Sequence, residues 1–270
     1  MATLRIGWPQ RWTRKQRSQA SIVMDSLILV AALWVAARVI AFAPEPIGSN
    51  AQFFADGTLM TVQLTVVSGV LGLVLGLLAA LGKISRILPL RWLCSFYIWI
   101  IRGTPLLVQL FLLYYGLAQF EAVRDSMFWP WLRSPAFCAL AAFAINTCAY
   151  TTEILHGTLS AVPKGEVEAA RALGMSPFTT LRRIVLPSAL RRALPAYGNE
   201  VVLMLHGTAL ASVVTLHDLT GVAREVNSIH YLPFEAFITA AVFYGLITAA
   251  LVALFHAAEK RWLMPMQRPS

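Results

Sequence analysis

Long apolar runs restrict this sequence to one class of fold. Residues 58–81 include no charged side chain, and about 20 consecutive apolar residues are enough for a helix to cross the hydrocarbon of a bilayer. Comparable runs recur along the 270 residues, so that 58% of the chain is hydrophobic and only 13% is charged, against about 25% in soluble proteins. Because a segment in lipid must satisfy its own backbone hydrogen bonds, we predict an all-α integral membrane protein.

The apolar runs divide the chain into six predicted spans. They cover residues 22–43, 58–81, 104–120, 135–157, 199–215 and 236–258. Between the second and third spans, residues 90–101 are expected to form a helix that lies partly at the membrane interface. Arg102-Gly103-Thr104-Pro105 interrupts the apolar pattern after it, and proline lacks the N–H that a continuing helix requires.

The first apolar run also has features of a secretory signal. The basic segment 1–21 precedes it, and Ala41-Phe42-Ala43 closes it in the manner of a cleavage site. Cleavage is disfavoured because Pro44 follows directly and because the run exceeds the apolar core of about 7–15 residues that signals have. We therefore expect an uncleaved transmembrane helix over residues 22–43.

The distribution of cations predicts the orientation in the membrane, because cytoplasmic loops carry an excess of Lys and Arg. With both termini in the cytoplasm, most of the 22 Lys and Arg residues fall in cytoplasmic segments, including 1–21 and the tail 259–270. The exceptions are Arg124, Arg133 and Arg224 in outside loops and Arg38 and Arg102 at membrane edges. Membrane topology, and not nucleic acid binding, therefore accounts for the net charge of +9.

A polar island at residues 163–187 interrupts the apolar pattern and is predicted to form two short helices. Gly174 stands where a helix end requires the left-handed conformation, which glycine adopts without steric penalty. Ser176 followed by Pro177 is a typical N-cap and first-turn pair, and Pro187 is expected to end the second helix. A charged helix-turn-helix between spans must project into water. It can be a solvated loop without a partner or a docking element.

The spacing within this island favours docking. It resembles the EAA loop of binding-protein-dependent ABC importer permeases. The residues that carry the motif are Glu168, Ala169, Ala170, Gly174, Ile184, Leu186 and Pro187. The resemblance implies that 163–187 is the coupling helix that sits in a cleft of a cytoplasmic ATPase. Small alanines permit close approach, and Glu168 can pair with a cation across such an interface.

The wider resemblance covers about three-quarters of the chain and is to permeases of the polar amino acid family, of the histidine/lysine/arginine/ornithine and opine types. It is carried by the stretches 146–157, 160–177, 186–210 and 258–263. The resemblance implies a type I ABC importer transmembrane domain over 53–258, with a five-helix core to which the helix 22–43 is additional. It further implies a bacterial inner membrane location.

The resemblance also implies partners: a cytoplasmic ATPase dimer, a sister permease subunit in a homo- or heterodimer, a periplasmic amino-acid-binding protein and membrane lipid. ATP and Mg²⁺ would be bound by the ATPase and no cofactor by this chain. One departure concerns His206-Gly207, which stand where many amino-acid permeases have a Lys-Asp pair, so the charge contacts of that pair are not transferred here.

Polar residues within the spans are candidates for the substrate path, because an ionisable side chain in a membrane is costly. Asn146, Tyr150 and Glu153 follow i, i+4 and i+7 spacing and share one stripe of a helix. Glu153 can pair with a cationic substrate side chain while the other two orient the α-groups. Alternatively, Glu153 lies near the cytoplasmic end of its span and pairs with an arginine of a loop.

The fifth span adds Glu200, His206 and Thr208. Glu200 borders the cytoplasmic boundary and is expected to have a gating or structural role, as is Arg102. His206 and Thr208 are further candidates for the path, although a helix–helix hydrogen bond is an equally ordinary role for a histidine within a span.

Other functional classes are disfavoured. Gly76…Gly82-Lys83 lacks the glycine spacing and the following Ser/Thr of a phosphate-binding loop, so no nucleotide site is expected. The five histidines lack metal-ligand spacing with acidic residues, which disfavours a membrane-embedded enzyme, and the three cysteines form no disulfide or metal set. An ion-coupled secondary transporter and a membrane scaffold remain as alternatives, but six helices without an internal repeat are few for a complete path.

Overall fold

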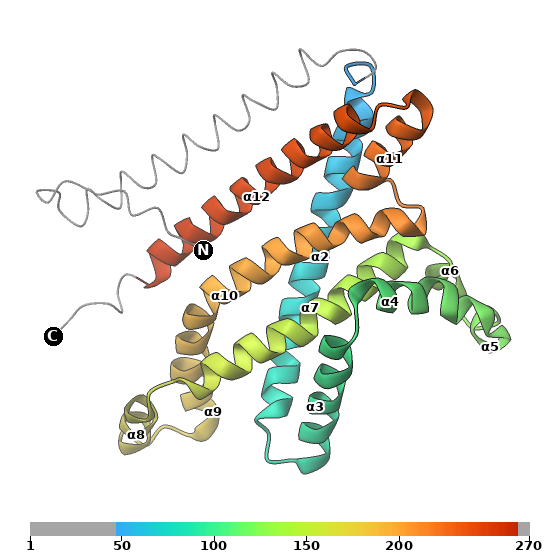
Figure 1. The fold of residues 1–270 in the computed structure, drawn as a ribbon. Coiled ribbons are helices and arrows are strands. Elements are labelled where there is room, and N and C mark those ends of the chain that lie inside the picture. The colour runs from blue at the N-terminus through green and yellow to red at the C-terminus, as the bar shows by residue number, and fades with distance from the viewer. Residues whose placement is uncertain (1–46, 264–270) are drawn as a thin grey trace, which may run out of the picture.

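A computed structural model describes residues 47–263. The predicted first span 22–43 and the basic segment 1–21 lie outside the described residues, as does the end of the C-terminal tail. Within the described range every regular element is helical, which confirms the predicted fold class. Figure 1 shows long helices that cross one another, with two short helices at one end.

Three helices are individually long and apolar enough to cross a membrane: α2 (Ala51–Lys83), α7 (Pro135–Ser160) and α12 (Pro233–Leu263). Two further spans arise if each of two bent helix pairs is counted as one, namely Leu88–Gly103 with Leu106–Gln119 and Pro177–Val214 with Leu219–His230. The described range therefore accounts for up to five spans, the number predicted for the part of the chain after residue 43.

Helix α2 runs through the molecule and packs closely against α7 (Figure 1). A Cβ atom at Gly72 would lie 2.6 Å from Cγ2 of Thr147, and one at Gly76 would lie 2.9 Å from Cβ of Thr151. The glycines of α2 therefore allow close helix contact, as predicted for small residues in membrane helices. The Thr152 hydroxyl also donates to the Gly76 carbonyl at 3.3 Å.

The predicted interfacial helix and third span meet at a sharp break. Helix α3 (Leu88–Gly103) ends at the predicted position, and the chain turns by 105° into α4 (Leu106–Phe111). A π-helical turn, η1 (Leu112–Gly116), and a 3₁₀ turn, η2 (Leu117–Gln119), complete the segment. Short helices α5 (Glu121–Arg124) and α6 (Trp129–Leu132) then lead to α7.

The prediction that Pro187 ends a helix is wrong. Helix α9 (Pro177–Thr180) continues through a π-helical turn, η3 (Leu181–Val185), into α10 (Leu186–Gly207). Pro187 lies in the first turn of α10, where its missing N–H removes no necessary bond, and the wider π turn before it accommodates the ring. The helix that contains the predicted fifth span therefore begins well before residue 199, and the last part of the span is a 3₁₀ segment, η4 (Thr208–Val214).

The segment 216–235, expected to be a loop, contains helix α11 (Leu219–His230). Asp218 caps it, because its carboxylate accepts from the backbone N–H groups of Thr220 at 3.2 Å and Gly221 at 3.0 Å. The Leu219 N–H donates to the Thr61 hydroxyl of α2 at 3.0 Å. Leu219 and its buried neighbours pack against the start of α2 and α12, which makes α11 part of the core and not a solvated loop.

Candidate functional site

The helices of the polar island occupy one end of the molecule, where α2 also ends (Figure 1). Helix α8 (Lys164–Ala172) ends in a left-handed turn at Gly174, whose φ is +72°. The Gly174 N–H donates to the Arg171 carbonyl at 2.9 Å, and the Met175 N–H donates to the Ala170 carbonyl at 3.1 Å. These bonds form a Schellman motif, which confirms the predicted role of Gly174.

The second helix of the island begins as predicted. The Ser176 side chain accepts from the Thr179 N–H at 3.3 Å, and Pro177 occupies the first turn of α9. The Thr180 hydroxyl donates to the Ser176 carbonyl at 3.0 Å. Local hydrogen bonds therefore define the angle between α8 and α9.

The residues of the EAA motif divide between two faces of the island. Glu168 and Ala169 are exposed, whereas Ala170 is buried with 3% of its surface accessible. Half-buried residues toward α10 complete the motif, namely Ile184, Leu186 and Pro187. The exposed face of α8 is thus available to a partner, and the buried face holds the island to the membrane helices.

Two exposed apolar residues next to the Gly174 turn were not singled out from the sequence. Leu173 is 82% exposed and Phe178 is 71% exposed. Their position beside a glycine turn in an otherwise polar segment is the signal that could have identified them. Large exposed apolar side chains in an aqueous loop mark an interaction surface.

The island is fixed to the spans below it. Val167 and Val185 pack against a buried cluster of α2, α7 and α10 that includes Ala80, Leu155 and Ala189. A salt bridge joins Arg192 of α10 to Glu166 of α8 at 3.8 Å. Helix α8 is therefore held against α2, α7 and α10 by apolar packing and one ion pair.

The predicted stripe of α7 meets the ends of α2 and α3. Glu153 forms a hydrogen-bonded ion pair with Lys83, the last residue of α2. Arg102, in the last turn of α3, lies 4.0 Å from the other carboxylate oxygen. The Arg102 guanidinium also lies 5.1 Å from the centre of the Tyr150 ring, within the range of a cation–π contact. Lys83 was not among the predicted site residues.

Asn146, the third residue of the stripe, supports the break between α3 and α4. Its amide donates to Oε1 of Gln109 at 3.1 Å. The Gln109 amide in turn donates to the carbonyls of Ile101 at 2.7 Å and Thr104 at 3.1 Å. These carbonyls lie at the end of α3, where the helix no longer provides partners. Gln109 could have been found as the polar residue in an apolar run.

The remaining predicted residues are dispersed over α10 and η4. Glu200 is buried with 8% of its surface accessible. His206 is exposed, and its Nε2 lies 3.2 Å from the Thr248 hydroxyl of α12. Thr208 is fully buried and donates to the Leu205 carbonyl at 2.6 Å, so it does not face a path within this chain.

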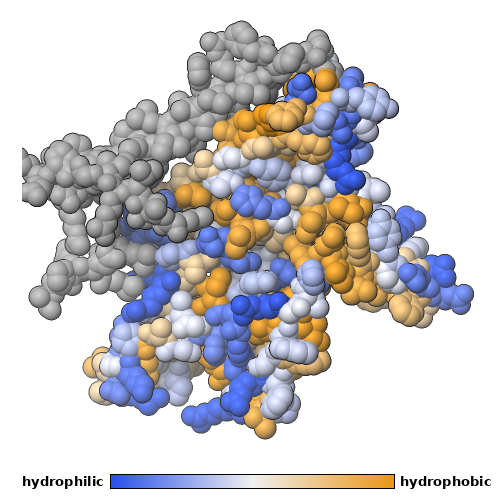
Figure 2. Space-filling model, in the orientation of Figure 1, coloured by the Kyte–Doolittle hydropathy of each residue, from blue (hydrophilic) through white to orange (hydrophobic). Residues whose placement is uncertain are grey.

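The cluster around Arg102 lies at the surface of the single chain. Side-chain exposure is 44% for Arg102, 29% for Glu153 and 19% for Lys83. Figure 2 shows hydrophilic residues gathered in the lower half of this face, while apolar residues cover α4 and the upper part of α12. Charged side chains in a membrane protein face a partner or a water-filled cavity and not lipid.

The comparison with known proteins places this arrangement in a family. The sequence profile of the "binding-protein-dependent transport system inner membrane component" matches residues 72–263. The chain belongs to this family. It is therefore an inner membrane component with a role in transport.

Individual members of the family are similar over most of their length. The histidine/lysine/arginine/ornithine transport system permease protein HisM of Escherichia coli (strain K12) is 47% identical over 215 residues, which cover 79% of this chain and 90% of HisM. The nopaline transport system permease protein NocM of Agrobacterium fabrum is 46% identical, covering 77% of this chain and 86% of NocM. The octopine permease protein OccM of Rhizobium radiobacter is also 46% identical, covering 76% of this chain and 83% of OccM.

Solved structures agree with the family assignment. The crystal structure of an amino acid ABC transporter with histidines matches with a TM-score of 0.72 and 38% identity, covering 80% of this chain and 96% of that one. An inward-facing structure of the MetNI methionine ABC transporter matches with a TM-score of 0.60, covering 83% of this chain and 100% of that one. At 21% identity, the second likeness shows the fold alone, which is that of a type I importer permease.

Proposed function

We propose that this chain is the permease subunit of an ATP-driven importer for polar or cationic L-amino acids of the histidine, lysine, arginine and ornithine class. The observation that carries the proposal is the 47% identity to HisM over 79% of the chain. The amino acid transporter structure with a TM-score of 0.72 supports the same substrate class.

The proposed coupling element is the island 163–187, docked on a cytoplasmic ATPase dimer that binds ATP and Mg²⁺. Its exposed Glu168, Ala169, Leu173 and Phe178 form the contact face, and the buried cluster beneath α8 transmits movement to α2, α7 and α10. Rotation of the ATPase subunits during hydrolysis would then tilt these helices together.

The proposed substrate path lies between this chain and a sister permease subunit. The Arg102 cluster offers both signs of charge at the surface of one chain, which suits a zwitterionic substrate. A cationic substrate side chain would replace Lys83 at Glu153, and the substrate α-carboxylate would meet Arg102. A periplasmic binding protein would deliver the substrate from the other side.

The experiment that tests the proposal is ATP hydrolysis by the purified complex in lipid, with the binding protein present, across the common amino acids. Stimulation confined to arginine, lysine, histidine and ornithine is the expected result. Glu153→Gln should reduce this stimulation for lysine and arginine more than for histidine, whose side chain is mostly neutral above about pH 7. Stimulation by apolar amino acids alone would contradict the substrate class.

Opines are the second candidate substrates, because NocM and OccM are 46% identical to this chain. An opine joins an amino acid to a second carboxylic acid, so it would place an additional carboxylate near the path. Including nopaline and octopine in the same assay separates the two candidates. Stimulation by an opine, and by no free amino acid, would favour the second.

A further inference from the structure

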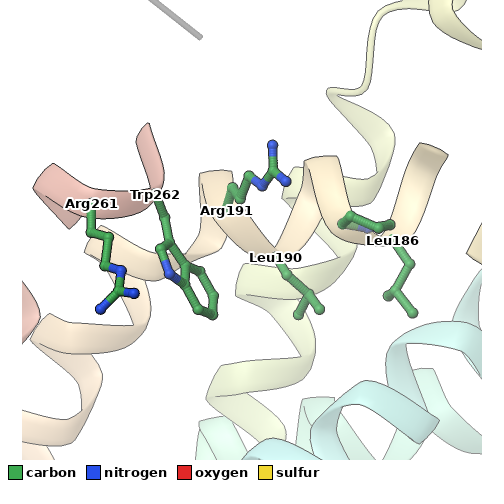
Figure 3. Close-up of a pocket in the computed structure, with 6 residues that line it drawn as sticks. Leu186, Leu190, Arg191, Arg261 and Trp262 are labelled. Carbon is green, nitrogen blue, oxygen red and sulfur yellow. The ribbon is translucent and has the colours of Figure 1, made fainter. Parts of the chain in front are cut away.

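A groove where α10 meets the end of α12 combines two arginines with apolar walls. Its volume is about 520 Å³, within the range of small-molecule sites. The residues that line it are Leu186, Pro187, Leu190, Arg191, Arg261 and Trp262. Figure 3 shows them in a row, with the indole of Trp262 between Arg261 and Leu190.

The groove lies where the membrane meets water. Helix α12 carries Glu235 in its first turn and then no Asp, Glu, Lys or Arg before Glu259-Lys260-Arg261 near its end. Tryptophan is enriched at the interface, and Trp262 is 52% exposed. The opposite wall begins at Leu186 and Pro187, the last residues of the charged island 163–187. The floor of the groove therefore lies at the depth of lipid headgroups.

The charge in the groove is positive and unpaired within residues 47–263. Neither Arg191 nor Arg261 has an acidic partner among the salt bridges of this range. Both residues are exposed, and their guanidinium groups point to different sides in Figure 3. Each can therefore meet an anionic oxygen separately, and guanidinium forms its strongest hydrogen bonds with carboxylate and phosphate.

The other walls are apolar. Leu186, Pro187 and Leu190 present aliphatic surface, and the Trp262 ring adds an amphipathic face. A ligand that matches both parts carries a phosphate next to hydrocarbon. We propose that this groove binds the headgroup of an anionic phospholipid of the adjacent leaflet, with the phosphate at Arg261 and the start of an acyl chain on Leu190 and Trp262, while Arg191 adds positive charge on the other side. Basic pockets between transmembrane helices bind lipid headgroups in this way.

The test uses native mass spectrometry to measure the phospholipid bound to the full-length chain. The chain is purified in mild detergent with its co-purifying subunits and is titrated with phosphatidylglycerol or phosphatidylcholine. The wild-type protein should retain phosphatidylglycerol in preference to phosphatidylcholine. The double variant Arg191→Gln/Arg261→Gln should lose the preference, at about fivefold in affinity for each arginine. Arg124→Gln/Arg133→Gln, which removes the same charge at the C-terminal ends of α5 and α6, should retain it.

A charge-preserving variant and a soluble competitor test the lipid site further. Arg191→Lys/Arg261→Lys preserves the charge and should retain part of the lipid preference. A chain that had lost its fold would retain none of it. The soluble headgroup glycerophosphoglycerol should compete poorly, because it has no acyl chain for the apolar wall. The proposal is overturned if the Gln variant keeps the lipid preference, if the soluble headgroup competes as well as the lipid, or if the Gln variant loses a protein subunit while retaining its lipid. These results do not depend on the transported substrate.

Discussion

Single residues in this chain act through partners that are distant in the sequence. Glu153 and Lys83 are 70 positions apart, yet their ion pair joins α7 to the end of α2. Gln109 and Asn146, 37 positions apart, connect the broken end of α3 to α7. In both cases the hydrogen-bonding partner of a partly buried polar side chain comes from another helix.

The ion pair between Lys83 and Glu153 should couple the two residues energetically. We expect Glu153→Gln and Lys83→Met each to destabilise the protein, because each leaves one half-buried charge without its partner. The double variant should be less destabilised than the sum of the single variants, with a coupling of about 0.5–3 kcal/mol. Thermal unfolding of the four proteins measures this, and additive effects would show that the pair contributes nothing.

Substitutions of Gly174 should act through the backbone conformation of the turn and not through steric contact with neighbouring atoms. Its φ is +72°, and no atom lies within 4 Å of an added Cβ. Gly174→Val should therefore strain the turn by about 1–2 kcal/mol and reduce ATPase binding, whereas Gly174→Asn should retain more binding because asparagine tolerates this conformation. Pull-down of the ATPase compares the two. Equal ATPase binding by both variants would show that the conformation of this turn does not affect docking.

Residue-level prediction from sequence was most accurate where the signal is local. Gly174 and Ser176-Pro177 could be placed because the conformation of a turn is determined by neighbouring residues. Lys83 as the partner of Glu153 could not, because only the packing of α2 on α7 brings the two together. From the sequence, a loop arginine and a cationic substrate were the alternative partners of Glu153, and the structure adds a lysine at a helix end.

At the scale of elements, the helix propensity of single residues did not predict how the chain continues past a proline or where an additional helix forms. The proline at position 187 was expected to end a helix, but a π turn over Leu181–Val185 allows the chain to continue into α10. Helix α11 was missed because its cap at Asp218 and its apolar face lie in a segment with mixed polarity. The charge-free second span was predicted correctly because length and hydropathy suffice for it.

The α2–α7 contact should be sensitive to glycine substitution at one position and not at another. Gly72→Ala would place its Cβ 2.6 Å from Cγ2 of Thr147, and we expect a loss of about 1–3 kcal/mol from overpacking. Gly157→Ala in α7 is the matched control, because an added Cβ there meets no atom within 4 Å. Thermal unfolding of both variants in the same detergent tests the difference, and equal midpoints would contradict close packing at Gly72.

The exposed apolar pair of the island should be needed for docking and not for folding. Leu173→Ser and Phe178→Ser remove side chains that are 82% and 71% exposed, so the stability of the chain should be unchanged. Burial of such side chains at an interface contributes about 1.5–3 kcal/mol each, and ATPase affinity should fall at least tenfold for the double variant. Retained affinity would place the contact elsewhere on the island.

At the scale of the whole molecule, the chain has the form of one part of a larger assembly. The Arg102 cluster is at its surface, and the helices α8 and α9 of the charged island lie at one end (Figure 1). Type I importer fold and family membership could be predicted from the EAA spacing, since that motif occupies one continuous stretch. The contacts of Lys83 and Arg102 with Glu153 could not, because they depend on how α2, α3 and α7 pack together.

The measurement that tests the central claim most directly is uptake of labelled arginine into proteoliposomes that contain the assembled complex, with ATP inside and the binding protein outside. We predict uptake that requires both ATP and the binding protein and that is lost in the Leu173→Ser/Phe178→Ser variant. Uptake by this chain alone, equal with and without ATP, would contradict the account and would indicate a secondary transporter.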